Sequence, residues 1–227
     1  MSKPEPILSE NASPRGAVAG VAIVLSSLVG MIAVAHHPSA HHVRDGADLL
    51  AQIVALRVTD QAVHAAAIAA EGGLLFGFLV FALRRGIRGN AVLAGLVGYA
   101  VGAVAVIGAA AIDGFITPAL AAHYAAASPA EISVAVQLIT ACAIAIQVLT
   151  KIWLFAVSLA VIVWSAGIVR GTPMQRGIAV LGFASSALLV VAGLLAGNVN
   201  AHTLGVIVLV QTVWAVAIGV LMIRDEI

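Results

Sequence analysis

The sequence predicts an all-α, polytopic membrane protein built as a six-transmembrane-helix bundle. Its 227 residues are 62% hydrophobic and only 9% charged, whereas soluble domains carry about 25% charged residues. A bilayer core of about 30 Å needs about 20 apolar residues per helix. Six stretches meet this requirement, approximately at residues 17–35, 62–83, 91–112, 146–168, 177–196 and 203–223.

The basic residues predict how these helices are oriented. Eight of the eleven lie at the termini or in the second and fourth connections: Lys3, Arg15, Arg84, Arg85, Arg88, Arg170, Arg176 and Arg224. Cytoplasmic loops carry the excess of Lys and Arg, so this side is predicted to be the cytoplasm. Both termini are then cytoplasmic, and the outer loops are 36–61, 113–145 and 197–202. We expect an integral protein of the bacterial inner (plasma) membrane.

The chain is expected to form one transmembrane domain, residues 15–227, after a mobile cytoplasmic tail at residues 1–14. Residues 48–58 mix apolar and polar side chains in a pattern typical of a short amphipathic helix at the outer interface. Two small-residue motifs, Gly73-x-x-x-Gly77 and Gly98-x-x-x-Gly102, predict close helix packing. The Ala33-Val34-Ala35 run resembles a signal-peptidase site, but the 19 apolar residues before His36 favour a retained helix.

Composition also excludes several classes of function. A formal net charge of +1, with no cluster of Lys and Arg, argues against binding to nucleic acid. The single cysteine, Cys142, excludes an internal disulfide and a cysteine-rich metal cluster. Haem is not expected, because only His64 and His202 are near helix ends. The expected surroundings are the lipid bilayer, with a protein partner or a homo-oligomer as further options.

All seven histidines fall on the predicted outer side, and imidazole is the commonest side-chain metal ligand. Four of them are packed into residues 36–42, His123 lies in an outer loop, and the remaining two lie near helix ends. The predicted metal ligands are His36, His37, His41, His42, His64, Asp113 and His202. His64 and Asp113 are expected at the same depth on neighbouring helices. Nitrogen and carboxylate ligands favour zinc or copper, with iron as an alternative.

Glu71 and Lys151 are the candidate catalytic residues. Glu71 falls inside the hydrocarbon region, where an ionisable group costs on the order of 3 kcal/mol unless it is paired or neutral. It is interpreted either as a structural hydrogen-bonding group or as a proton-transfer group. Lys151 is expected near the outer surface, as a partner of Asp113 or with its ammonium among the headgroups.

Three functions are compatible with these residues. The first is a membrane metalloprotein with an outer metal site that oxidises or hydrolyses a lipid-soluble or periplasmic substrate. The second is an accessory or scaffold subunit without chemistry, and the third is a small metal-cation transporter or delivery protein. The helices offer few polar side chains between Glu71 and the predicted cytoplasmic side, which argues against a continuous transport path.

Overall fold

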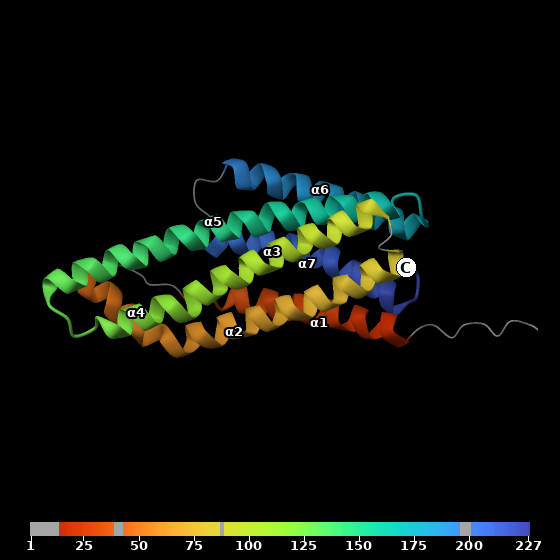
Figure 1. The fold of residues 1–227 in the computed structure, drawn as a ribbon. Helices are drawn as coiled ribbons and strands as arrows, with labels where there is room; N and C mark the ends of the chain where they lie inside the picture. Colours follow the sequence, from red (N-terminus) through yellow and green to blue (C-terminus); the bar gives the residue numbers. More distant parts are fainter. Residues whose placement is uncertain (1–13, 39–42, 87–88, 196–200) are drawn as a thin grey trace, which may run out of the picture.

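The computed structural model describes residues 14–38, 43–86, 89–195 and 201–227, and all regular structure within them is helical (Figure 1). Six of the described helices are long and apolar enough to cross a membrane, which supports an integral membrane protein. The elements are α1 (Pro14–Ala35), α2 (Gly46–Arg85), α3 (Asn90–Ala111), the π-helix η1 (Ile112–Ile116), α4 (Thr117–His123), α5 (Pro129–Ile168), α6 (Pro173–Leu195) and α7 (Ala201–Ile223).

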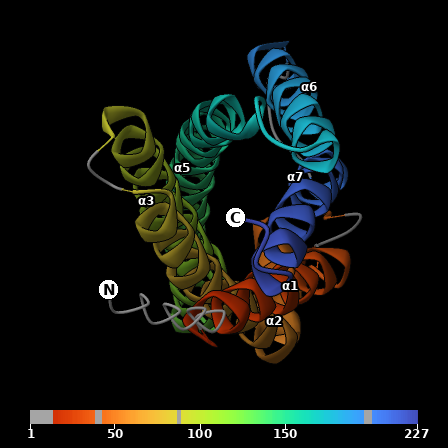
Figure 2. The ribbon, with the colours of Figure 1, turned by 90° about the vertical axis from the view of Figure 1, so that its right-hand side faces the viewer.

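The long helices form a ring, seen end-on in Figure 2. Contacts follow the order α1, α2, α3, α5, α6 and α7, and α7 packs back against α1. Each long helix therefore lies beside the next one along the chain, as short connections between membrane helices favour. The ring encloses the site described below.

Most basic residues within the described ranges lie at one end of this ring, and the exceptions are Arg44, Arg57 and Lys151. Arg84 at the end of α2 pairs with Asp225 after α7, and the Arg85 guanidinium donates a hydrogen bond of 2.6 Å to the carbonyl of Gly167 in α5. The start of α1 and the C-terminus lie at this same end (Figure 1). Its exposure to the cytoplasm stays a prediction, and the tail at 1–13 lies outside the described residues.

The helices α2 and α5 have 40 residues each, so each is about 60 Å long, twice the hydrocarbon thickness. The Asp45 side chain caps the start of α2 by accepting a 2.8 Å hydrogen bond from the amide of Asp48. Ser128 and Glu131 form a capping box at the start of α5. With α4, the first halves of α2 and α5 extend beyond the other helices at the end opposite the arginines (Figure 1).

This extension corrects part of the prediction from sequence. The outer loops expected at 36–61 and 113–145 are mostly helical, because α2 begins at Gly46 and α5 at Pro129. Residues 48–58 are helical as expected, but they continue into α2 instead of forming a separate short helix. A small cluster of Leu50, Ala121 and Ala135 packs this region together. Whether it lies at the membrane interface stays a prediction.

The third helix does not end at residue 112, where the predicted apolar stretch ends. It passes through η1 into α4, forming one helical run from Asn90 to His123. Pro118 lacks an amide hydrogen and cannot donate to the carbonyl four residues earlier. The main-chain amide and the hydroxyl of Thr117 both donate to the carbonyl of Ile112, five residues earlier, with the hydroxyl at 3.0 Å, and the chain widens locally into a π turn.

Small residues let the helices of the ring approach closely, as the two glycine motifs predict. Side chains of α1 lie against Gly73 and Gly77 of α2, and α5 lies against Gly98 and Gly102 of α3. A Cβ atom at Gly77 would overlap the side chain of Ile23 and lie 3.1 Å from the carbonyl oxygen of Ala19.

We expect Gly77→Leu to destabilise the bundle by roughly 1–3 kcal/mol, the usual effect of overpacking. Gly72→Leu is the matched control on the same helix, because a Cβ atom there meets no neighbour within 4 Å. Thermal unfolding in detergent should show a lower midpoint for Gly77→Leu only. Equal midpoints for the two variants would show that α1 and α2 do not pack at this glycine.

Candidate metal centre

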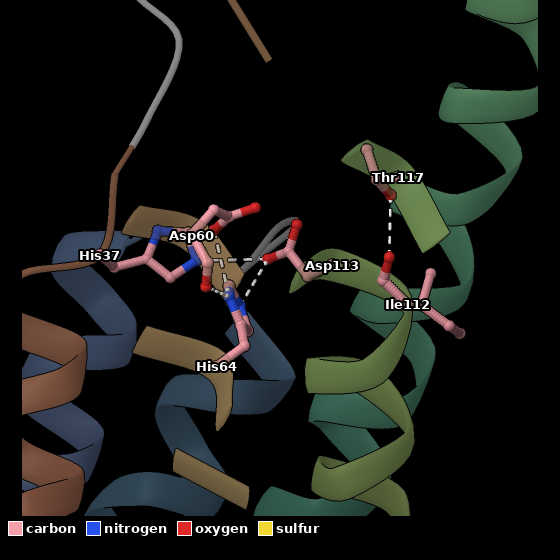
Figure 3. A network of polar contacts seen from close by, with 6 residues as sticks. All are labelled: His37, Asp60, His64, Ile112, Asp113 and Thr117. Atoms are coloured by element: carbon pink, nitrogen blue, oxygen red, sulfur yellow. Dashed lines mark hydrogen bonds and ion pairs between the residues drawn. The ribbon is translucent and has the colours of Figure 1, made fainter. Parts of the chain in front are cut away.

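Four polar residues meet at the end of the transmembrane ring opposite the arginines (Figure 3). His37 follows the end of α1, Asp60 and His64 lie on α2, and Asp113 lies in η1. They are 23%, 14%, 7% and 33% exposed at the side chain, in that order. His64 is thus enclosed, while the two residues that face it from other segments are partly open.

The carboxylate of Asp113 contacts both imidazoles with one oxygen. Its Oδ2 lies 3.2 Å from Nε2 of His37 and 3.4 Å from Nε2 of His64. The two rings meet edge to face, with centroids 5.0 Å apart. One carboxylate oxygen therefore joins three segments that are distant in sequence.

The other ring nitrogen of His64 faces Asp60. Nδ1 lies 2.8 Å from the main-chain oxygen of Asp60 and 3.1 Å from its Oδ1. Both are acceptors, so Nδ1 carries a proton and donates it. In a neutral imidazole the Nε2 lone pair then points at the Asp113 oxygen, and only a proton or a cation between them makes this contact favourable.

The local sequence explains how these groups meet. Asp60 and His64 are four residues apart and share one face of α2. The π turn sets the direction of Asp113, and π turns inside α-helices are frequent at functional sites. A Cβ atom at Gly114 would overlap the imidazole of His64, so only glycine lets η1 approach this ring.

The depth of the cluster follows from helix geometry. His64 lies 20 residues before Arg84 on an uninterrupted helix, which places the two about 30 Å apart. This distance equals the thickness of a bilayer core. The cluster therefore lies at one membrane surface if the arginines mark the other.

The other predicted ligands do not all join this cluster. His36 is exposed, and its Nδ1 lies 2.9 Å from the carbonyl oxygen of Ile32. His41 and His42 lie outside the described residues. His202 is in α7, but its side chain is not described. His123 ends α4 and contacts the ring of Tyr124, with centroids 4.8 Å apart.

A cavity of about 180 Å³ opens from this cluster into the ring, and residues of α1, α2, α3, η1, α5 and α7 line it. Its lining includes His37, His64 and Asp113 at one end and Phe78 and Trp214 farther in. The predicted catalytic residue Glu71 also lines it, whereas Lys151 lies on α5 outside the lining. The roles of both stay predictions.

Sequence reasoning missed Asp60. Its signal was the Asp60-x-x-x-His64 spacing, which places a carboxylate next to an imidazole on a helix. Residues 36–61 were expected to form a loop, and in a loop that spacing carries no such meaning. No family model, curated protein or solved structure matches the chain, so its function must be argued from these residues.

We expect Gly114→Ala to displace the His64 ring and break its contact with Asp113, because the new methyl group would occupy the ring's position. The measurement is the ¹⁵N NMR spectrum of histidine-labelled protein, with the His64 signals assigned from a His64→Gln variant. Gly108→Ala is the control, since its nearest neighbour would be a flexible leucine carbon at 3.4 Å. Unchanged His64 signals in Gly114→Ala would contradict the described contact.

Proposed function

We propose that this chain is an integral membrane metalloprotein that binds one divalent transition metal at the outer membrane surface. The proposed ligands are Nε2 of His37, Nε2 of His64 and a carboxylate oxygen of Asp113. Asp60 holds the remaining ring nitrogen of His64. The site draws on three segments of the bundle, so a bound metal would also fix their relative positions.

One observation carries this proposal: the spacing of the ligand atoms. A zinc ion with four ligands at 2.0 to 2.1 Å has neighbouring ligands about 3.3 Å apart. The Asp113 oxygen lies 3.2 and 3.4 Å from the two imidazole nitrogens. The contact of Asp113 with the two imidazoles needs a positive charge, and its two distances match those between neighbouring ligands of one tetrahedral metal ion.

The partner of His64 also supports a metal. Histidine ligands usually donate their second ring N–H to a carboxylate or a main-chain carbonyl, which fixes the tautomer. Asp60 offers both groups to Nδ1 of His64. An alternative ligand set is His37, Asp60 and His64, whose ligand atoms lie within 4.8 Å of one another. The variants below distinguish these two sets.

Three protein ligands leave a tetrahedral ion one position for water or substrate, as in catalytic zinc sites. The cavity begins at these ligands, so a lipid-soluble molecule in it could reach the metal. The reaction class that fits is hydrolysis or oxidation of such a molecule, or of one arriving from the periplasm. Zinc and copper suit the ligands best, with iron as the alternative.

The transporter hypothesis gains no support from the packing. Phe78, Trp164 and Trp214 stack within the ring, with centroids 5.2 to 6.4 Å apart. Trp164 and Trp214 are each 2% exposed. These rings lie between the cavity and the arginine end, where a cation path would have to pass.

The test is metal content after loading purified protein with Zn²⁺ or Co²⁺ and removing excess ion. Wild type should retain about one equivalent, and Asp113→Asn and His64→Ala should retain almost none, because each loses a ligand. Asp60→Asn should still bind, with affinity lowered about 10- to 100-fold, as expected for a group that orients a ligand.

The matched control is His36→Ala, which removes the exposed imidazole next to His37 and should leave metal content unchanged. A His41→Ala/His42→Ala variant tests the rest of the histidine run in the same way. Full metal content in both His64→Ala and Asp113→Asn would overturn the proposed site. Loss in Asp60→Asn but not in Asp113→Asn would replace Asp113 by Asp60 as the ligand.

A further inference from the structure

The interior of the cavity holds polar groups that the proposed metal site does not use. Apart from the proposed ligand His37 and from Trp214, whose Nε1 lies against Gly182 of α6 outside the lining, three residues that line it each have a buried side-chain atom without a hydrogen-bond partner among the described residues. The three atoms are Oγ of Ser27, Oε1 of Glu71 and Nε2 of Gln211. The residues come from α1, α2 and α7, so three helices supply unpartnered groups to one cavity.

Such groups are costly in a membrane protein. A buried polar atom without a partner costs about 1–3 kcal/mol, and most buried polar atoms in proteins are satisfied. Glu71 is 8% exposed and Ser27 is 3% exposed, so bulk solvent does not reach them freely. Their clustering around one cavity indicates a molecule that supplies hydrogen bonds there.

Three side chains of α2 line the cavity at regular intervals. His64, Glu71 and Phe78 are spaced by seven residues, so they share one face of the helix. All three line the cavity. Each interval spans about 10 Å, so the face presents an imidazole at the mouth, a carboxyl group midway and an aromatic ring at the inner end.

The inner end is shaped for a flat ring. Phe78 and Trp214 stack with their planes 19° apart and their centroids 5.8 Å apart. Tyr99 also lines the cavity, and its hydroxyl is a hydrogen-bonding neighbour of Glu71. A cavity of about 150 Å³ is enough to bind benzene. The volume of about 180 Å³ therefore suits one six-membered ring with a small substituent.

The unpartnered groups of the cavity indicate which substituent the bound ring carries. The amide Nε2 of Gln211 only donates, whereas Oε1 of Glu71 can accept. A phenolic hydroxyl matches both requirements, because its hydrogen can be donated to Glu71 while its oxygen accepts from an N–H group.

We propose that the middle of this cavity is a binding site for a lipid-soluble phenol, whose ring packs against Phe78 and Trp214 and whose hydroxyl group bonds to Glu71. The site uses none of the proposed metal ligands. Binding of the phenol is therefore separable from binding of the metal.

The test is quenching of tryptophan fluorescence by 4-bromophenol in purified, chelator-treated protein in lipid nanodiscs. Bromine quenches nearby indoles, and Trp214 forms part of the proposed site. We expect saturable quenching by 4-bromophenol and at least tenfold weaker binding of 4-bromoanisole, which has the same ring but no hydroxyl hydrogen. Glu71→Met, which removes the acceptor at similar volume, should weaken 4-bromophenol binding about tenfold.

The control is Ser158→Ala, because Ser158 is 1% exposed and has an unpartnered hydroxyl but does not line the cavity. It should bind 4-bromophenol like wild type, and so should His64→Ala, which separates this proposal from the metal site. Glu71→Gln guards against misfolding and should retain part of the affinity. Equal binding of 4-bromophenol and 4-bromoanisole would overturn the proposal. Quenching that never saturates would also overturn it, because it would show that the probes only partition into lipid or that water fills the cavity.

Discussion

The contact of one Asp113 oxygen with two imidazoles is the interaction on which the half of this bundle opposite the arginines depends. A carboxylate near the hydrocarbon boundary needs a partner, and Asp113 has His37 and His64 at 3.2 and 3.4 Å. The contact requires the π turn that directs Asp113 and the glycine that follows it. The end of α1, the middle of α2 and η1 are joined there by polar contacts, whereas the middle of the ring is held by close packing of small and aromatic residues.

The ring order of the helices explains why this cluster opens inward. Because α7 packs back against α1, the faces of α1, α2, α3, α5 and α7 enclose one shared cavity. Stacked aromatic rings close its inner end, and the polar cluster lies at its outer end. The proposed metal at the mouth, with the mainly apolar cavity behind it, would suit chemistry on a molecule that dissolves in the membrane. The same closure argues against a path for ions.

The sequence was sufficient to predict six helices long and apolar enough to span a membrane, since the required length follows from the thickness of the bilayer. It also predicted that His64 and Asp113 would lie together, because equal depth on neighbouring helices follows from helical rise. It did not predict Asp60, because the helical extension of α2 is stabilised by tertiary contacts such as those of Leu50. Nor did it predict the π turn, where Thr117 and Pro118 change the hydrogen bonding without ending the helix.

The most direct test of the metal centre is X-ray absorption spectroscopy of wild-type protein loaded with one equivalent of Zn²⁺. We predict a first shell of nitrogen and oxygen atoms at about 2.0 to 2.1 Å from the zinc, with the outer-shell scattering of two imidazoles. In Asp60→Asn the same two imidazoles should remain. A shell of six oxygen atoms without imidazole scattering would contradict the account, because the ion would then be hydrated and not held by His37 and His64.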